Sequence, residues 1–395
     1  KEKSLGKMSI TTSTNGVKMV AFSEYTKVCF SMLMQDLIAN IKYPSAVVQI
    51  SDAKYIDFPY EEDFYIQVVE SSLNHFDKIT AIGDKAINMP GYQEFDVTST
   101  SYKANNPITT ALLFGAIAQN TTEEVVHLKL AVTVPIVEAK TIGLMQNYKD
   151  LLTGRHVVMV FTQDGVRRME VHIDVAVVMN EGQAGFLGML DTSDPEFRSA
   201  LTHIYNELGE DEDPVSTFED FLIVDIGEGT TDLAVFRNKR FNPDFSYSVT
   251  RGYGNLLEDA MATAARENLT IESRKDLQKV LESTNKRRKE RRETWESYVR
   301  PTKDAFVNQV VDTIMKTYGS RDYFDAIIFL GGGFSALTGY TVEMGMTFTR
   351  DDSIFKELKK RLKEMNKSAD LIFGIPAPYS QGINERGLTQ VLSSM

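Results

Sequence analysis

Residues 225–232 form the sequence pattern with the most specific chemistry in this chain. They read Asp-Ile-Gly-Glu-Gly-Thr-Thr-Asp and follow the apolar run 221–224. The two glycines permit a tight turn whose backbone N–H groups can converge on phosphate oxygens, and the two threonines add hydroxyl donors. Asp225, at the end of a buried strand, can hold water in the shell of Mg²⁺, which keeps several waters in protein sites. The competing interpretation is a plain β-hairpin with glycines in its turn. The phosphate-binding residues predicted in this turn are Gly227, Glu228, Gly229, Thr230 and Thr231.

A second candidate follows the apolar strand expected over residues 325–330. This strand runs into Gly331, Gly332, Gly333 and Phe334, after which we expect a helix. Three glycines let the backbone lie flat against a nucleoside, and a helix N-terminus favours negative charge. Taken alone, the pattern fits a strand-to-helix connection without a ligand equally well.

The third candidate is the junction of a long strand and a helix at residues 180–185. Glu181 and Gln183 stand where polar groups of α/β folds face ligands, and either could orient an attacking water in phosphoryl transfer. The alternative is a carboxylate that satisfies the free N–H groups of the helix N-terminus.

The elements expected around these residues alternate between strands and helices, which indicates α/β layers. Residues 9–22 resemble residues 223–236, since each stretch is a strand, a small-residue polar turn and a second strand. In this match Asn15 stands against Gly229 and Lys18 against Asp232, and one copy opens each of two expected domains. The further strands are expected at 129–134, 156–161, 166–179 and 371–373, and the further helices at 136–152 and 353–365, with a final helix from 384. Residues 255–316 show a mostly helical and highly charged pattern.

Composition places the chain among ordinary globular proteins of two domains. It has 395 residues, 42% of them hydrophobic and 25% charged, and a formal charge of −12 that disfavours non-specific DNA binding. The single cysteine, Cys29, excludes an intrachain disulfide and predicts a reducing compartment. The histidines show no zinc spacing, and no apolar run approaches the roughly 20 residues that span a bilayer.

The order of these patterns resembles the actin, heat-shock chaperone and sugar-kinase superfamily. That order is a first phosphate hairpin (11–18), a connecting segment (180–185), a second phosphate hairpin (225–232), an adenosine segment (330–335) and a closing helix (384–392). Within the superfamily the chain most resembles the ParM-like plasmid-segregation actins of bacteria. Short matches support this at Tyr43-Pro-Ser-Ala-Val-Val, Ile82-Gly-Asp-Lys-Ala86, Val132-Thr-Val-Pro-Ile136 and Leu152-Thr-Gly-Arg-His-Val157.

The resemblance implies an actin-like α/β fold, with two related domains of mixed sheet and helices around a central nucleotide cleft. We expect domain I over 1–182 plus 368–395 and domain II over 183–367. The implied activity is that of a cytoplasmic ATPase that binds ATP (or GTP) with Mg²⁺, polymerises into filaments and segregates plasmid DNA. A DNA-binding adaptor protein is expected, without direct DNA contact or membrane association. Glu181 and Gln183 would serve hydrolysis, Asp225 the magnesium network, and glycines 331–333 with Phe334 the adenosine.

The first hairpin departs from the family pattern. Thr11 stands where the family carries Asp, and Ser13 stands where it carries Gly, while Lys18 remains as the expected phosphate contact. Because one carboxylate near the metal is lost, hydrolysis is expected to be slow or absent while binding survives. The phosphate-contacting residues implied here are Thr11, Ser13, Thr14, Asn15, Gly16 and Lys18.

Two rival functions stay open on the same fold. One is a nucleotide-binding structural filament with little turnover, and the other is a small-molecule kinase. Residues 286–292, which read Lys-Arg-Arg-Lys-Glu-Arg-Arg, are either a solvated helix face or a contact with an adaptor or with the acidic stretch 207–220 of a neighbouring subunit. Direct DNA contact is the third interpretation. The acidic stretch itself is expected to be a solvated loop.

Overall fold

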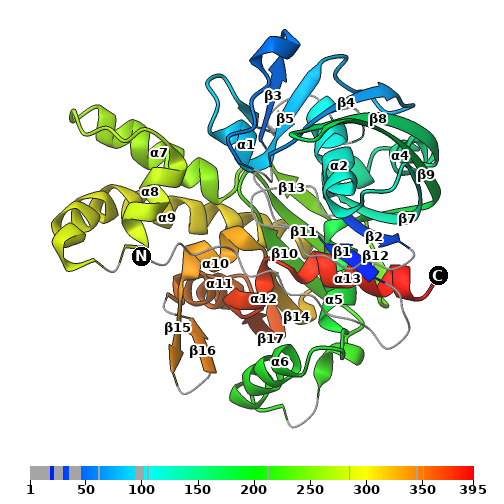
Figure 1. Ribbon diagram of the computed structural model, residues 1–395. Coiled ribbons are helices and arrows are strands. Elements are labelled where there is room, and N and C mark those ends of the chain that lie inside the picture. The colour runs from blue at the N-terminus through cyan, green and yellow to red at the C-terminus, as the bar shows by residue number, and fades with distance from the viewer. Residues whose placement is uncertain are drawn as a thin grey trace. The chain divides into compact units, whose positions relative to one another are not determined.

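The computed structural model describes residues 18–21, 30–34, 46–60, 63–94, 102, 104, 106–210, 213–283, 285–343, 346–349 and 351–395. The chain divides into two compact units. The first comprises Lys1–Asp191 with Gly382–Met395, and the second comprises Thr192–Gln381. Each unit has its own sheet and its own hydrophobic core (Figure 1). The fold is therefore mixed α/β with two domains.

The sheet of the first unit has, within the described residues, nine strands in the order β1-β2-β7-β9-β8-β4-β5-β3-β6. Strands β7 and β9 pair in parallel, and the other neighbours pair antiparallel. The strands expected at 156–161 and 166–179 are present as the antiparallel hairpin of β8 and β9. The strands are β1 (Lys18–Ala21), β2 (Phe30–Met34), β3 (Ala46–Ile50), β4 (Tyr65–Glu70), β5 (Ile79–Ile82), β6 (Gln93–Glu94), β7 (Val125–Val134), β8 (Gly154–Thr162) and β9 (Gly165–Asn180).

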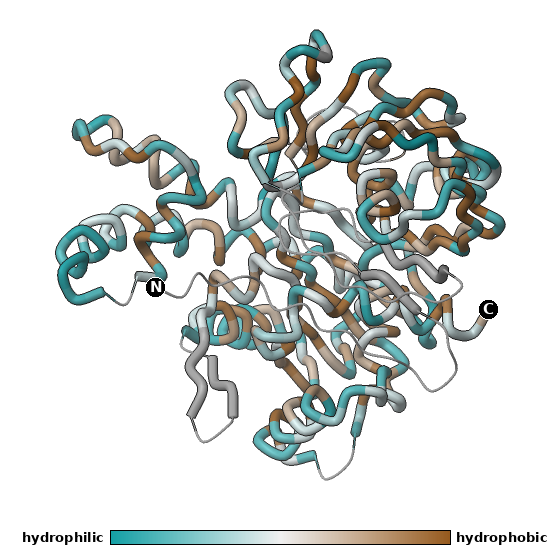
Figure 2. The backbone as a smooth tube through the Cα atoms, in the orientation of Figure 1, coloured by the Kyte–Doolittle hydropathy of each residue, from teal (hydrophilic) through white to brown (hydrophobic). Residues whose placement is uncertain are grey.

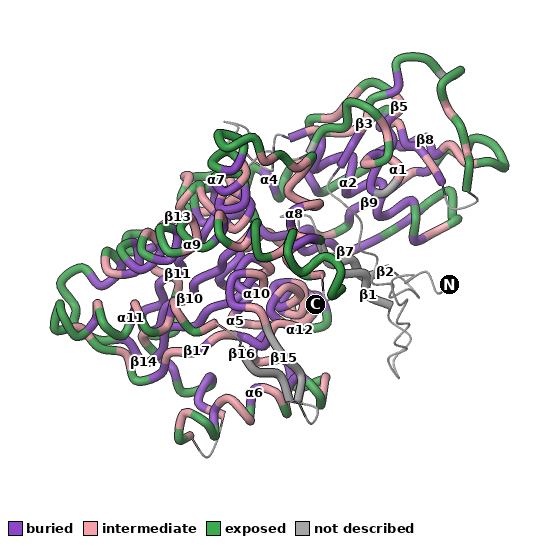
Figure 3. The backbone as a smooth tube through the Cα atoms, turned by 90° about the vertical axis from the view of Figure 1, so that its left-hand side faces the viewer, coloured by how far each residue is buried: buried purple, intermediate pink, exposed green. Residues whose placement is uncertain are grey.

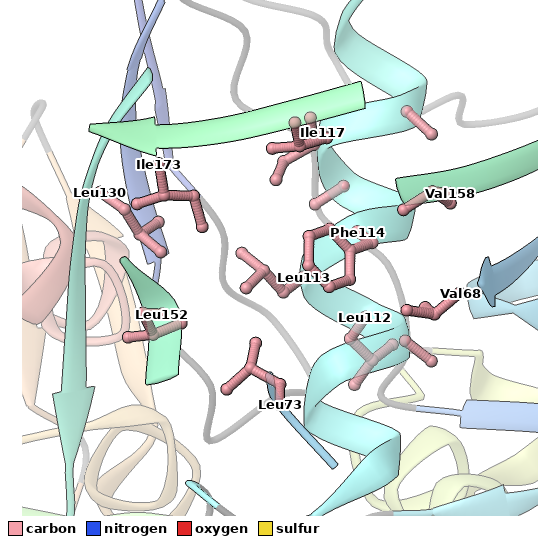
Figure 4. Close-up of a cluster of buried hydrophobic side chains, with 14 of the residues drawn as sticks. Val68, Leu73, Leu112, Leu113, Phe114, Ile117, Leu130, Leu152, Val158 and Ile173 are labelled. Carbon is pink, nitrogen blue, oxygen red and sulfur yellow. The ribbon is translucent and has the colours of Figure 1, made fainter. Parts of the chain in front are cut away.

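The core of the first unit forms around helix α2, Pro107–Asn120, which is buried along nearly all of its length. The side chain of Asn106 caps this helix by accepting from the N–H of Ile108 at 2.9 Å, and Pro107 fits the first turn, where no N–H is needed. Figure 4 shows α2 side chains directed toward residues of the surrounding strands. The other helices of this unit are α1 (Gly83–Ile87), α3 (Ile136–Ala139), α4 (Leu144–Leu152), α5 (Glu181–Met189) and α13 (Ile383–Ser393).

The sheet of the second unit has the order β12-β11-β10-β14-β17, and β13 also pairs with β11. Strands β10, β14 and β17 are parallel, whereas β10 and β11 form an antiparallel hairpin. Every residue of β10 and β11 is buried (Figure 3), which accounts for the apolar runs 221–224 and 233–236 within them. The strands are β10 (Phe221–Ile226), β11 (Thr231–Arg237), β12 (Arg240–Phe241), β13 (Tyr247–Val249), β14 (Tyr323–Leu330) and β17 (Ser368–Gly374), with a separate hairpin of β15 (Tyr340–Glu343) and β16 (Met346–Thr349).

Helices α7 and α8 lie beside the long helix α9 in the second unit (Figure 1). Helix α9 starts in the predicted basic stretch and buries Trp295, Phe306 and Ile314 farther along. The helices of this unit are α6 (Pro195–Glu207), α7 (Tyr253–Ala265), α8 (Arg274–Leu281), α9 (Lys289–Thr317), α10 (Gly332–Thr338), α11 (Ser353–Glu364) and α12 (Ala377–Ser380), and two 3-10 turns span Pro214–Ser216 and Lys286–Arg288. Among the described residues, no helix is both long and apolar enough to cross a membrane.

Two sequence expectations differ from the structure. The acidic stretch 207–220 is not simply a solvated loop, because Glu207 ends α6 and both Val215 and Phe218 are buried. The unit boundaries also differ from the expected divisions at 182/183 and 367/368. Helix α5 packs against α13 in the first unit, and β17 pairs with β14 in the sheet of the second.

Candidate functional site

The turn between β10 and β11 closes on itself through one backbone hydrogen bond. The N–H of Gly227 donates to the carbonyl of Thr230 at 2.9 Å, and the strands pair up to Ile226 and Thr231 on either side. The expected contribution of the Gly227 amide to a phosphate is therefore replaced by a bond within the turn. Residues 228 and 229 form the tip, where Glu228 is exposed and Gly229 is half-buried.

Asp225 is the next-to-last residue of the buried strand β10 and lies beside Gly331, the residue that follows β14. The Asp225 carboxylate is 7% exposed. A Cβ at Gly331 would lie 2.3 Å from its Oδ1 and 2.5 Å from the carbonyl oxygen of Ile226. Gly331 also has a φ of +99°, which side chains rarely adopt. Only glycine at this position lets the strand end approach the carboxylate so closely.

The starts of two helices abut the same turn. At the start of α7, the N–H groups of Tyr253 and Gly254 donate to the carbonyls of Gly227 (2.9 Å) and Glu228 (2.7 Å). A Cβ at Gly252 would lie 2.4 Å from the Gly227 carbonyl oxygen. At the start of α10, a Cβ at Gly333 would lie equally close, at 2.4 Å from that oxygen. These glycines fix the turn rigidly by direct backbone contact.

Charged side chains surround the tip of the turn. Nη1 of Arg274, the first residue of α8, lies 3.5 Å from Oε1 of Glu228 and 3.4 Å from Oε1 of Glu258. A Cβ at Gly254 would come within 2.7 Å of that guanidinium. The Arg274 cation therefore offsets the negative charge that Glu228 brings to the tip.

The remaining predicted residues of the hairpin have structural partners. The Thr231 hydroxyl donates to the carbonyl of Arg251 at 2.9 Å, and the buried Asp232 accepts from the Ser248 hydroxyl. Thr230 is also buried, at 2% exposure. Both hydrogen bonds join the start of β11 to residues 248–251, in and just after β13.

Gly331 and Phe334, both in the segment after β14, have different surroundings. Backbone at Gly331 is held by Ser380, whose carbonyl accepts from the Gly331 N–H at 3.3 Å and whose hydroxyl donates to the Gly331 carbonyl at 3.2 Å. Phe334, in contrast, is 2% exposed and stacks on Phe329 with ring centroids 5.6 Å apart. Its ring belongs to the hydrophobic core, so this side chain is left out of the ligand set proposed for the nucleoside.

Glu181 and Gln183 occupy the first turn of α5 in the first unit. Parallel pairing of β7 with β9 ends at Val134 and Asn180, and the Asn180 side chain caps the helix by accepting from the N–H of Gln183 at 2.8 Å. The Asn180 Nδ2 group donates to the Gln183 side-chain oxygen at 2.7 Å. Glu181 is 6% exposed, and its carboxylate lies where the helix dipole favours negative charge.

The predicted first hairpin falls outside the described residues, apart from the start of β1. Thr11, Ser13, Thr14, Asn15 and Gly16 are not described, and for Lys18 only the backbone is. Their predicted phosphate contacts remain predictions.

The donor set suits a magnesium ion held through water. Among the described residues there is no group of three or more His, Cys, Asp or Glu side chains that could hold a metal directly. Asp225 is a buried carboxylate in a cradle that a Cβ on Gly331 would fill, and the buried Asp232 stands opposite it in the β10–β11 pairing. Because Mg²⁺ takes few protein carboxylates and keeps its waters, this arrangement fits it.

Sequence reasoning overlooked Gly252, Gly254 and Arg274. The signal was present, because Gly252-Tyr-Gly254 directly precedes an amphipathic helical stretch. Its partner, the turn at 227–230, lies far enough upstream that the sequence pattern alone did not connect the two.

Comparison with known families places both units in one group of proteins. Residues 23–183 match the family model described as the N-terminal domain of actin-like proteins. Residues 223–340 match the model described as the C-terminal part of the archaeal MreB-like actin homologue. Together the two matches cover well over half of the chain. A search of curated proteins found no match.

Solved structures of similar fold cover nearly the whole chain. The apo ParM protein of psk41 has a TM-score of 0.57 at 14% identity, covering 96% of this chain and 98% of that one. Bacillus thuringiensis ParM with AMPPNP has a TM-score of 0.54 at 15% identity, covering 96% and 99%. An archaeal actin homologue has a TM-score of 0.56 at 13% identity, covering 93% and 96%. At these identities the likeness concerns the fold.

Proposed function

The chain belongs to the actin-like proteins, and from this membership we propose that it binds ATP with Mg²⁺, hydrolyses it and assembles into filaments. ATP is favoured over GTP because structures of Bacillus thuringiensis ParM contain ATP, ADP or AMPPNP. The ParM-type fold and the sequence resemblance to plasmid-segregation actins support a role in moving plasmid DNA through an adaptor protein.

The observation that carries the proposal is the contact between the β10–β11 turn and the two glycine-bearing helix starts. It anchors the turn at the carbonyls of Gly227 and Glu228, and Asp225 is buried directly behind it. A rigid turn is the arrangement that phosphoryl transfer requires, because its catalysis consists mostly of positioning and electrostatic stabilisation.

Each residue of the candidate site has a distinct proposed part. Bound Mg²⁺–ATP would supply the phosphoanhydride bond to be hydrolysed. Gly229 and Thr230 would bind phosphate oxygens, and Asp225 would orient metal-bound water. Glu181 would hold the attacking water and accept its proton at the carboxylate, with Gln183 orienting it. The proposed contacts of the glycine segment are made by the backbone of Gly331, Gly332 and Gly333.

The proposal is tested by nucleotide binding and light scattering on the same samples. We expect wild type to bind a fluorescent ATP analogue, and scattering to rise with ATP and fall as ADP accumulates. Asp225→Asn should weaken Mg²⁺-dependent binding at least about tenfold, equivalent to ~1.4 kcal/mol. Asp244→Asn is the matched control, because Asp244 is an exposed turn residue of the same unit.

Other results would separate the rival functions. Scattering that rises and then persists indicates a structural filament with little turnover, which the loss of the family carboxylate at Thr11 also favours. Nucleotide binding without any scattering indicates a small-molecule kinase. A wild-type chain that binds neither ATP nor GTP contradicts the proposal.

A further inference from the structure

The basic stretch Lys286–Arg292, called the basic segment from here on, has six cations in seven residues. It forms the 3-10 turn Lys286–Arg288 and the first turn of α9. All its residues are exposed except Arg292, which is half-buried. The start of α9 is correspondingly coloured hydrophilic in Figure 2.

Two of these cations are paired with described residues of the same helix. Lys289 lies 3.5 Å from Glu293, and Arg292 lies 3.4 Å from Glu296, each one helical turn away. Lys286, Arg287, Arg288 and Arg291 form no ion pair with any described residue. Among the described residues, ion pairs within the helix therefore neutralise only two of the six cations in the basic segment. A solvated helix face explains the minority of the charge.

The position of these cations is unfavourable for the helix itself. The N-terminus of a helix carries partial positive charge, and a cation there costs typically about 0.3–1 kcal/mol. Burial of apolar surface does not offset this cost, because the segment is exposed. Folding stability alone thus gives no reason for four cations at this place, whereas an anionic partner would.

A groove adjoins the basic segment. It has a volume of about 560 Å³, and its lining includes the Arg288 and Arg291 side chains, Lys279, and the apolar residues Ile271 and Val280. A surface that combines guanidinium groups with an apolar floor suits a protein side-chain surface better than a bare phosphate chain.

We propose that the basic segment and this groove are a docking surface for an acidic face of a second copy of this chain. The inference rests on the proposed self-assembly and names one surface for it. The whole chain carries −12 although this segment is strongly positive, so the rest of each copy is more negative still. Arginine fork geometry matches carboxylates, and opposite charges on different parts of one protomer suit head-to-tail assembly.

Protein is favoured over nucleic acid because acidic side chains interrupt the surface. Glu282, Glu290 and Glu293 lie within or beside the basic segment, and Glu272 and Asp276 line the groove. These carboxylates would repel a continuous phosphate backbone but can meet basic residues of a mixed protein surface.

The acidic stretch 207–220 of the other copy offers the basic segment fewer free carboxylates than its composition indicates. Asp213 pairs with Arg198, and Asp220 pairs with Arg237 and Arg321, within its own unit. The carboxylates that dock on the basic segment are therefore to be located by experiment.

The first test reverses the unpaired charges. A variant carrying Lys286→Glu, Arg287→Glu, Arg288→Glu and Arg291→Glu should raise the critical concentration for ATP-dependent assembly at least about tenfold, or ~1.4 kcal/mol. The matched control reverses four exposed cations elsewhere, with the same change in net charge: Lys78→Glu, Lys149→Glu, Arg266→Glu and Lys359→Glu. Equal effects of the two variants would overturn the proposal.

Three further readouts distinguish a lost docking contact from damage to nucleotide binding, to folding or to DNA binding. Nucleotide affinity should be the same in wild type and variant, and the melting temperature of the variant should be equal or higher, since acids suit a helix N-terminus. A DNA duplex that binds wild type but not the variant, with assembly unchanged, would overturn the proposal in favour of nucleic acid. A wild type that binds nucleotide without assembling would overturn the proposed self-assembly as well.

The second test locates the partner carboxylates. Equal amounts of unlabelled and ¹⁵N-labelled chain are assembled with ATP and treated with a zero-length carbodiimide cross-linker, which joins lysine amines to carboxylates. We expect Lys286 and Lys289 to yield cross-linked peptides of mixed isotope composition. Links confined to peptides of a single isotope composition would show that the segment contacts only its own chain.

Discussion

The need for glycine at position 331 was predicted from the sequence, but the structure gives a different physical reason for it. The sequence predicts that a glycine after β14 permits flat backbone near a nucleoside. The structure gives a tighter constraint, because a Cβ there would lie 2.3 Å from Oδ1 of Asp225. That contact joins two segments more than a hundred residues apart, so a pattern search that treats each motif separately identifies both residues but not their dependence on each other.

His156 gives a testable pH dependence at the same scale. Its ring is fully buried, Nε2–H donates to the Leu152 carbonyl at 2.9 Å, and Nδ1 accepts from the Ser71 hydroxyl at 2.8 Å. Burial lowers the pKa of His156 below its ordinary value of 6.5, with a smaller contribution from His172. The unfolded state therefore binds a proton more readily, so the stabilisation is complete above about pH 6.5 and is lost as the pH falls below it.

We expect the free energy of unfolding to decrease from pH 7 to pH 5, with this residue contributing at most ~1.4 kcal/mol per pH unit. Urea unfolding at several pH values measures the slope. His156→Gln should reduce it, because this variant has no imidazole at the buried position. Identical slopes in wild type and His156→Gln would contradict the assignment.

Secondary-structure elements with strong local patterns were predictable. The apolar runs of β10 and β14 and the hairpin of β8 and β9 are where the sequence places them. The stretch 207–220 was misjudged because its acidic composition conceals Val215 and Phe218, whose burial depends on partners elsewhere in the unit. Phe334 was predicted to contact the adenosine because it follows three glycines. Its place in the sequence does not reveal that its ring points into the hydrophobic core.

The contact between α5 and α13 yields a prediction about whole elements. A Cβ at Gly387 would lie 1.9 Å from the carbonyl oxygen of Ala184, and one at Gly188 would lie 2.1 Å from that of Ile383. Gly387→Ala must push the two helices apart, and we expect it to lower the free energy of unfolding by about 1–3 kcal/mol.

Urea denaturation monitored by circular dichroism measures this effect. Gly382→Ala, at the N-cap of α13, is the control, since a Cβ there meets no atom within 4 Å. Its effect should stay below about 1 kcal/mol, the size of a changed N-cap. If both substitutions destabilise equally, the close helix contact is not what requires glycine at 387.

For the whole molecule, the sequence supports two α/β units with separate cores, and the actin-like family matches both. The exact boundaries of the two units could not be predicted from the sequence. Sequence motifs mark where ligand-facing turns lie, whereas a unit boundary depends on which core a helix or strand packs against. Most of α5 was expected in the second domain but packs on α13 in the first unit, and β17 was expected in the first domain but extends the second sheet.

The packing of α5 leads to a prediction about hydrolysis in the assembled state. Glu181 is in the first turn of α5, and close backbone contacts bind this helix to α13. Any assembly contact that shifts these helices moves them together, and Glu181 with them.

We therefore expect phosphate release per molecule to rise with protein concentration and to level off above the critical concentration for assembly. Glu181→Gln should abolish this rise while leaving ATP binding within about twofold, because uncharged glutamine is a poor proton acceptor. A release rate per molecule that is constant at every concentration, in samples whose scattering proves assembly, would show that hydrolysis is independent of the filament.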